Sequence, residues 1–215
     1  MQQLRTRWTT FWQRIGAAGD GPALFEQLAR CYEHEDRAYH NLTHIAACMA
    51  DLDEVRSQLN GPDEVTAEAA LWFHDVIYLP GIALNEQYSE EFAAWALFEV
   101  GEVPDKTLRP RVHDAILATK RHAHSPNLAT RVVVDIDLGI LGAEPARCAQ
   151  YCVAIRQEYS FLDERTFATG RLAFLQKLAK RKSLYHTTHF QKKYEARARE
   201  NIDTEIRMLH TLLRR

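Results

Sequence analysis

Hydrophobic residues recur at intervals of three or four along most of this chain, which is the spacing of one face of an α-helix. Residues 189–213 show the pattern over a long stretch, with Tyr194, Ala198 and Ile202 opening one apolar stripe. The first such stripe lies in residues 3–15 and consists of Leu4, Trp8, Phe11, Trp12 and Ile15. The pattern predicts an all-α protein.

Turn-forming residues divide the apolar pattern into separate helices. Asp20-Gly21-Pro22 and Asn60-Gly61-Pro62-Asp63 each combine a capping residue with a proline at the first helical positions. Both motifs predict a helix start. The predicted helices include residues 22–34, 39–59, 144–161, 163–181 and 189–213, with further helices through 68–75, through 92–100 and up to about 120.

The apolar segment from Val132 to Leu141 is ambiguous. Its run of three valines suits a buried strand, but a short apolar run also suits a buried helix. A lone strand would have no partner to pair with. We therefore expect a helix here.

The length of 215 residues is enough for one well-buried core. No linker, repeat or low-complexity segment interrupts it, so we expect a single all-α domain over residues 1–215, with the helix in residues 1–20 packed on it. The formal net charge of -2 gives no reason to expect a nucleic-acid polymer or an anionic membrane as partner. No run approaches the ~20 apolar residues of a membrane span.

The N-terminus carries no apolar signal region, and a cytoplasmic protein is expected. The four cysteines form no C-x-x-C pair, which gives a structural zinc site no support. We interpret them as small buried hydrophobic residues.

Candidate chemistry begins where the apolar helix from Glu68 ends in the adjacent pair His74-Asp75. Both side chains are costly to bury without a partner, and a metal ion would satisfy both. The dipeptide alone is a weak signal, because a second copy, His113-Asp114, occurs in a polar setting. We interpret that second copy as solvated or capping.

Two other places can supply further ligands. His44 opens a predicted helix and follows His40 by four residues, so both can lie on one helical face. Asp137 lies in the apolar segment, where an unpaired carboxylate would be costly. Together with His74 and Asp75 these residues offer two imidazoles and two carboxylates, a set that suits Mn, Fe, Co, Ni, Zn or Mg. The alternative is that they are polar core residues with protein partners.

The order of these residues resembles the HD-domain superfamily of metal-dependent phosphohydrolases, and most closely a bacterial subgroup of predicted phosphohydrolases. The resemblance covers about residues 25 to 210. The motifs that carry it are Tyr39-His40-Asn41-x-x-His44-Ile45, Phe73-His74-Asp75-x-x-Tyr78, Asn85-Glu86-x-x-Ser89, Ala118-Thr119-Lys120-x-His122 and Asp135-x-Asp137-Leu138-x-Ile140-Leu141-Gly142. Each motif is weak alone, and their order and spacing strengthen the signal.

The resemblance implies a single-domain helical bundle of the HD-domain type with a divalent metal ion at its centre. The ligand pattern of the family falls on His44, His74, Asp75 and Asp137, with Asp137 preferred to Asp135. It implies hydrolysis of a small nucleotide, or of a related phosphate ester or anhydride, by water that the metal activates.

The sequence departs from the family pattern at the catalytic carboxylate: many HD hydrolases carry an acid shortly after the His-Asp pair, and Val76-Ile77-Tyr78 contains none. We expect Glu86, together with the ligand Asp75, to take the catalytic role. The alternative for Glu86 is a charge that complements the dipole of a helix N-terminus.

Substrate phosphate requires cations, and Lys120, His122, Arg156 and Arg171 are the candidates. Each of them can equally be a surface charge. Residues Tyr39, His40, Asn41 and Asn85 are expected to line the pocket. The spacing of His122 and His124 does not compel a second metal.

Two other functions are also compatible with the sequence. A non-catalytic HD-type module that binds a nucleotide or a metal is favoured by the missing acid after His74-Asp75. A helical interaction protein is suggested by the aromatic stripe Trp8, Phe11 and Trp12, a pattern more typical of a core or of a contact in a homodimer.

Overall fold

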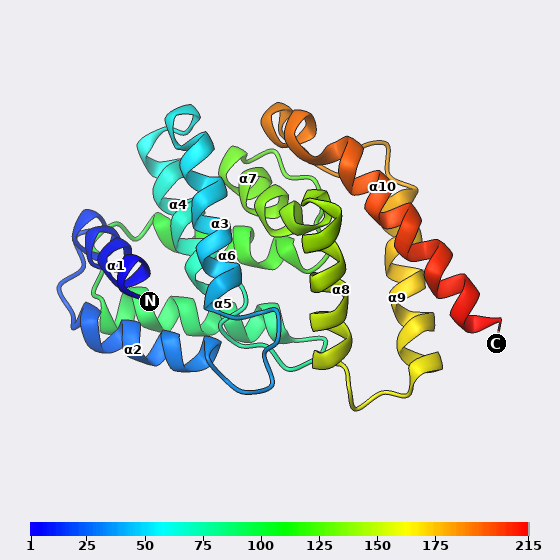
Figure 1. Ribbon diagram of the computed structural model, residues 1–215. Helices are drawn as coiled ribbons and strands as arrows, with labels where there is room; N and C mark the ends of the chain where they lie inside the picture. The colour runs from blue at the N-terminus through cyan, green and yellow to red at the C-terminus, as the bar shows by residue number, and fades with distance from the viewer. Residues whose placement is uncertain (215) are drawn as a thin grey trace. The chain divides into compact units, whose positions relative to one another are not determined.

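The computed structural model describes residues 1–214 and contains helices and connecting loops but no strand within that range (Figure 1). The all-α prediction is confirmed. The chain divides into two compact units, Met1–Ile136 and a second that begins at Asp137. The prediction of a single HD-type domain stays a prediction.

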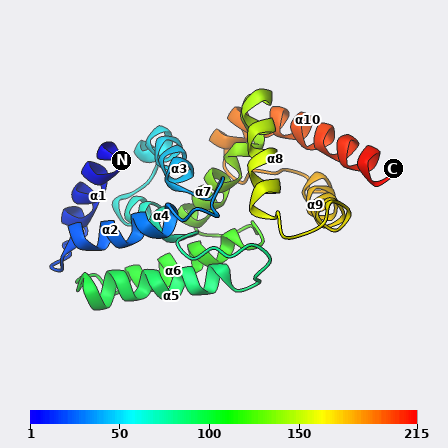
Figure 2. The ribbon, with the colours of Figure 1, turned by 60° about the horizontal axis from the view of Figure 1, so that its bottom comes forward.

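The first unit holds seven α-helices and two short irregular helices. Contacts join α1 to α2, α3 to α4, and α6 to both α4 and α5; the last pair, α5 and α6, lies side by side in both ribbon views (Figure 2). The elements are α1 Gln2–Arg14, α2 Gly21–Tyr32, α3 Leu42–Val55, η1 Arg56–Gln58, α4 Gly61–Phe73, α5 Asn85–Ala94, the π-helix η2 Trp95–Val100, α6 Leu108–Thr119 and α7 Leu128–Asp137, whose last residue is the first of the second unit.

Side-chain caps begin three of these helices, α2, α3 and α4. The Asp20 carboxylate accepts a hydrogen bond from the Ala23 amide, and the Asn60 side chain accepts one from the Asp63 amide. Each cap satisfies an amide that has no partner within its helix. The helix starts predicted at both motifs are confirmed.

The aromatic stripe of α1 is buried in the core of the first unit. The rings of Trp8 and Trp12 stack at 5.2 Å, and the Trp8 indole donates a hydrogen bond of 2.7 Å to the Gly21 carbonyl. A Cβ at Gly21 would lie 2.4 Å from the Trp12 ring, so this close approach of α1 and α2 requires glycine. The stripe packs inside the unit and supplies no interaction surface.

A buried carboxylate ties α1 to α4 and η1. Glu68 is 1% exposed and lies among Arg7, Arg14 and Arg56. Arg7 donates to it over 2.9 Å, and Arg56 lies 3.2 Å away. Three guanidinium groups thus compensate the desolvation of one charge on the helix that leads to His74.

The second unit consists of η3 Leu138–Gly142, α8 Pro145–Glu158, α9 Glu164–Ala179 and α10 Thr188–Leu213. Helix α10 packs against α9 and η3. The amide of Asn201 on α10 donates to the carbonyls of Leu141 and Ala143 over 2.8 and 2.9 Å. The segment 132–141 is helical throughout, as expected: α7 ends at Asp137, and the 3-10 helix η3 follows directly.

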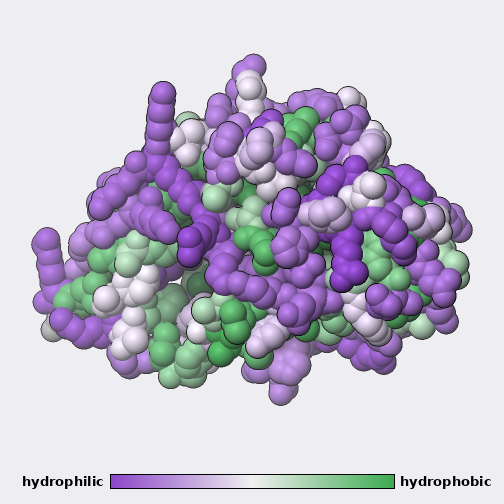
Figure 3. Space-filling view, turned by 180° about the vertical axis from the view of Figure 1, so that it is seen from behind, coloured by the Kyte–Doolittle hydropathy of each residue, from purple (hydrophilic) through white to green (hydrophobic). Residues whose placement is uncertain are grey.

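Hydrophilic residues cover most of the face in Figure 3, with hydrophobic residues in smaller groups among them. Among residues 1–214, none of the helices combines the length and the apolar character needed to cross a membrane.

Candidate metal centre

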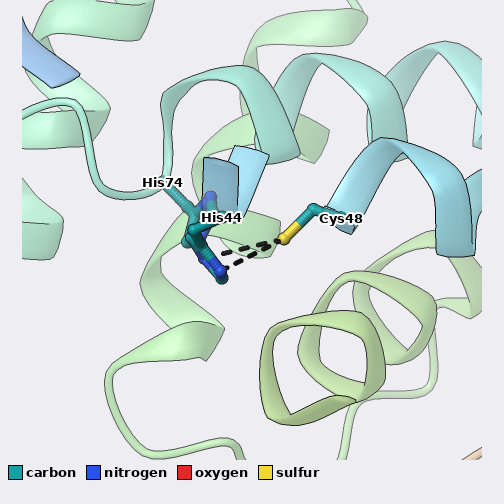
Figure 4. Close-up of side chains that lie close together, drawn as sticks. All are labelled: His44, Cys48 and His74. Carbon is teal, nitrogen blue, oxygen red and sulfur yellow. Dashed lines mark hydrogen bonds between the residues drawn. The ribbon is translucent and has the colours of Figure 1, made fainter. Parts of the chain in front are cut away.

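Two histidine rings meet where α4 ends and α3 begins. His74 is the first residue after α4, and His44 lies in the first turn of α3. Their Nε2 atoms are 3.1 Å apart, and both side chains are almost fully buried (Figure 4). The two residues are 30 positions apart in the chain, so only folding brings them together.

The Asp75 carboxylate joins the two rings. Its Oδ2 atom lies 3.1 Å from Nε2 of His74 and 3.7 Å from Nε2 of His44. Asp137, the last residue of α7, completes the group: one ligand atom from each of the four side chains lies within 4.8 Å of the others. Among the described residues, the carboxylate that completes this group is Asp137 and not Asp135, as predicted.

The separations of these atoms suit one divalent ion. Ligands bound at about 2.1 Å in adjacent positions lie roughly 3.0 to 3.4 Å apart. The observed 3.1, 3.1 and 3.7 Å are close to this range. Two neutral imidazoles and two carboxylates would neutralise a 2+ charge in a largely buried place. The cluster could therefore hold a metal ion.

The orientation of His74 is set by the backbone. Its Nδ1 atom lies 3.1 Å from the Leu71 carbonyl, which can only accept a hydrogen bond. A hydrogen bond from Nδ1 to this carbonyl leaves Nε2 as the ring nitrogen available to a metal ion. This is the arrangement in which a second hydrogen bond fixes the ring of a metal ligand.

Arg37 holds the backbone of the His-Asp turn. Its guanidinium donates to the carbonyls of Asp75 and Val76 over 2.6 and 2.8 Å. It also donates to the His40 carbonyl over 3.2 Å, which ties the loop before α3 to the turn after α4. The orientation of Asp75 thus depends on a cation that the sequence patterns did not indicate.

Tyr32 lies beside the same turn and stays protonated. Burial raises the pKa of its hydroxyl well above the usual value, and the neighbouring Asp75 charge raises the pKa further, against the opposing effect of Arg37. The hydroxyl donates a hydrogen bond of 3.0 Å to the Trp72 carbonyl. Its role is to fix the end of α4.

Two of the residues predicted to line a pocket, Tyr39 and His40, have rings close to that of His44. His40 precedes α3, so it does not share a helical face with His44; that expectation is wrong, because Asn41 caps the helix and its first turn begins at Leu42. The His40 ring stacks on Tyr78 at 3.9 Å, and the Tyr39 ring lies 4.9 Å from that of His44. A pocket role for these residues stays a prediction.

Asn85 has a structural task. Its amide accepts from the Leu79 amide over 3.0 Å and donates to the Leu79 carbonyl over 2.9 Å. Ser89 makes the matching pair of hydrogen bonds, each 3.1 Å, to the backbone of Ile77. The first turns of α5 therefore clamp the segment that follows His74-Asp75.

Glu86 lies in the first turn of α5 and pairs with a predicted substrate-binding cation. Its Oε2 atom is 3.7 Å from Nζ of Lys120, at the end of α6. Lys120 also donates to Gln87 over 2.9 Å and to the Ala83 carbonyl. His122 follows in a left-handed conformation, with φ of 47°. Among the described residues, the group of four clustered ligands does not include Glu86.

The two predicted arginines lie in the second unit and have internal partners. Arg156 donates to the carbonyls of Tyr159 and Leu162 over 2.7 and 2.8 Å, at the C-terminus of α8. Arg171 forms a paired contact of 2.8 and 3.1 Å with Glu205, and its side chain is 8% exposed. Their role in phosphate binding stays a prediction.

Two residues near the centre were not predicted. Arg37 has no sequence signal beyond its charge, because its partners are backbone carbonyls distant in the chain. Cys48 has one: it follows His44 by four residues on α3, a spacing that places both on one face. The His113-Asp114 pair lies in the middle of α6 and is exposed, so it is solvated as expected but caps no helix.

Comparison of the chain with protein-family models, curated proteins and solved structures found no match.

Proposed function

We propose that this chain is a metal-dependent phosphohydrolase of the HD-domain type, acting on a small nucleotide or a related phosphate ester or anhydride. The observation that carries the proposal is the convergence of His44 on α3, the pair His74-Asp75 after α4, and Asp137 at the end of α7. Four polar groups in one largely buried place are costly unless they share a partner. A divalent ion is the partner that suits all four.

The bound ion would polarise a phosphoryl oxygen and lower the pKa of a coordinated water. The chain's own residues supply the rest. His74, fixed by its hydrogen bond to the Leu71 carbonyl, and Asp75, fixed through Arg37, would hold the ion in one geometry. Four protein ligands leave about two positions of a six-coordinate ion for water and substrate.

The proton of that water needs an acceptor, and Asp75 and Glu86 are the proposed carboxylates. Glu86, in the first turn of α5, and Lys120, at the end of α6, place one negative and one positive charge 3.7 Å apart. In this proposal Lys120 neutralises substrate phosphate while Glu86 orients water.

The test is phosphate release from a panel of nucleotides and simple phosphate esters, with Mn²⁺, Co²⁺, Ni²⁺, Zn²⁺ or Mg²⁺ added to metal-stripped protein. Activity that depends on metal and is abolished by Asp75→Asn supports the proposal. Metal binding without release from any member of the panel counts against hydrolysis.

That second outcome would favour a non-catalytic metal- or nucleotide-binding module. The observation in its favour is that no acid occurs in Val76-Ile77-Tyr78, while the nearest candidate, Glu86, has Lys120 as a partner. Tight nucleotide binding without turnover would establish that function.

A further inference from the structure

The thiol of Cys48 lies beside the two histidine rings of the candidate centre. Its Sγ atom is 3.6 Å from Nε2 and 3.7 Å from Nδ1 of His44 (Figure 4). Sγ and one nitrogen from each of His44 and His74 lie within 4.8 Å of one another, and all three residues are buried. The two imidazoles therefore have a sulfur neighbour as well as the two carboxylates.

Local structure places the sulfur there. His44 and Cys48 are one turn apart on α3, so their side chains project from the same face. That face is buried: Cys48 is 2% exposed and His44 is 5% exposed. Helix α3 packs against α4, the helix that ends just before His74.

The two sets of ligands differ in the ions they prefer. Carboxylates suit hard ions such as Mn²⁺ and Mg²⁺, whereas a thiolate suits Zn²⁺ and Cd²⁺. We propose that Cys48 is a further metal ligand, which binds a thiophilic divalent ion together with His44 and His74. The inference rests on the metal centre proposed above, but not on the hydrolytic reaction.

The distances fit this second set. A tetrahedral zinc ion, with bonds of about 2.3 Å to sulfur and about 2.05 Å to nitrogen, separates sulfur from nitrogen by roughly 3.6 Å and two nitrogens by roughly 3.4 Å. The observed separations are 3.6 Å and 3.1 Å. Sγ is almost equally far from both nitrogens of His44, so it lies alongside the ring. Binding the ion would require the sulfur to turn from this position toward the lone pair of Nε2.

A consequence is discrimination between metals. An ion bound through sulfur keeps both histidines but needs fewer of the carboxylates. Zn²⁺ or Cd²⁺ would then bind in a different mode from Mn²⁺ at the same pair of imidazoles. Cys48 would set which ions compete for the centre.

The competing role for Cys48 is to orient His44 through a hydrogen bond between thiol and imidazole. Serine separates the two roles, because its hydroxyl can make that hydrogen bond but cannot replace a thiolate as a soft ligand. Cys48→Ser should bind the metal as tightly as the wild type if the thiol only positions the ring. If sulfur binds the ion, Cys48→Ser should bind the metal as weakly as Cys48→Ala.

The experiment titrates metal-stripped protein with Cd²⁺ and, separately, with Mn²⁺, by calorimetry and by the ultraviolet charge-transfer band of a cadmium–thiolate bond. We expect the band to grow with the first equivalent of Cd²⁺ in the wild type. Cys48→Ser and Cys48→Ala should lose it and bind Cd²⁺ at least about 100-fold more weakly, a larger effect than the loss of a supporting hydrogen bond. Mn²⁺ affinity should be almost unchanged.

The matched control is Cys148→Ser, which alters another buried cysteine in the second unit and should behave as the wild type. A band or Cd²⁺ affinity retained by Cys48→Ser would overturn the proposal. So would Cd²⁺ binding without any band, and in that case Mn²⁺ binding would leave the centre itself standing. Failure of the wild type to bind either ion would overturn both.

If the variants do not fold, X-ray absorption of the wild type with one equivalent of Zn²⁺ decides the question. One sulfur ligand supports the proposal, and a shell of nitrogen and oxygen alone overturns it.

Discussion

Arg37 donates a hydrogen bond of 2.6 Å to the backbone carbonyl of Asp75. Its second donor nitrogen reaches the next carbonyl, of Val76, over 2.8 Å. A guanidinium fork thus fixes two successive peptide groups, which a lysine with one nitrogen cannot do in the same geometry. The position of the Asp75 carboxylate follows from this backbone.

Arg37→Lys should therefore weaken metal binding. We expect a roughly 10- to 100-fold loss of Mn²⁺ affinity, the range typical of losing a partner that orients a ligand. Calorimetry on metal-stripped protein measures it. Arg30→Lys, an exposed substitution on the neighbouring helix α2, is the control and should have no effect. Equal affinity for Arg37→Lys and the wild type would show that the fork does not position Asp75.

Glu68→Gln should destabilise the first unit. It removes the charge that compensates Arg7, Arg14 and Arg56 in a place that is almost fully buried. The expected loss is about 2–3 kcal/mol, because hydrogen bonds to charged groups are among the stronger ones. Urea unfolding checks it, with the exposed Glu35→Gln as a control of unchanged stability. Similar urea midpoints for Glu68→Gln and Glu35→Gln would show that the charge of Glu68 does not stabilise the first unit.

Asp53 should make stability fall in acid. Partial burial raises the pKa of its carboxyl, but the hydrogen bonds and charges of Arg7 and Arg56 outweigh that effect and hold the pKa below the usual 3.8. A folded-state pKa below the unfolded one stabilises the protein above 3.8, and this contribution is lost as the pH falls through the lower value. The exposure of this side chain makes the effect modest.

The stability difference between the wild type and Asp53→Asn should accordingly be present at pH 7 and decline as the pH falls below 3.8 and through the lower pKa of the folded state. Urea unfolding at a series of pH values measures it. A difference that does not change with pH would mean that the charge of Asp53 contributes nothing.

Arg171 distinguishes a structural role from phosphate binding. Its guanidinium is buried against Glu205 and donates to the Tyr151 hydroxyl over 3.1 Å. Arg171→Gln should cost about 3–5 kcal/mol of stability, because it leaves a largely buried carboxylate without its partner. Thermal unfolding measures this in the absence of any substrate. A variant as stable as the wild type, with weaker phosphate binding, would instead support the role expected from sequence.

The helical fold could be predicted from the sequence because the signals for helix formation are local. The spacing of apolar residues and the caps at Asp20 and Asn60 act within a few positions. The segment from Val132 to Leu141 was ambiguous because three valines suit strand and helix alike, and the absence of a partner strand decided it. The error at His40 arose at a boundary, since the Asn41 cap starts α3 one residue after it.

The ligand set was predicted in part from the cost of burying His74, Asp75 and Asp137, which is a local property of an apolar stretch. The residues that surround those ligands were not predicted. Arg37 acts on carbonyls 38 and 39 residues away, and no pattern in the sequence connects them. The sulfur of Cys48 had a local signal, its one-turn spacing from His44, that an interpretation as a buried hydrophobic residue overlooked.

The most direct measurement of the central claim is a calorimetric titration of metal-stripped protein with Mn²⁺, comparing the wild type with His74→Ala. We expect one ion per chain in the wild type and loss of binding in the variant, while His113→Ala, which alters an exposed histidine of α6, binds as the wild type does. Binding that survives in His74→Ala, or a wild type that takes up no ion, would contradict the account.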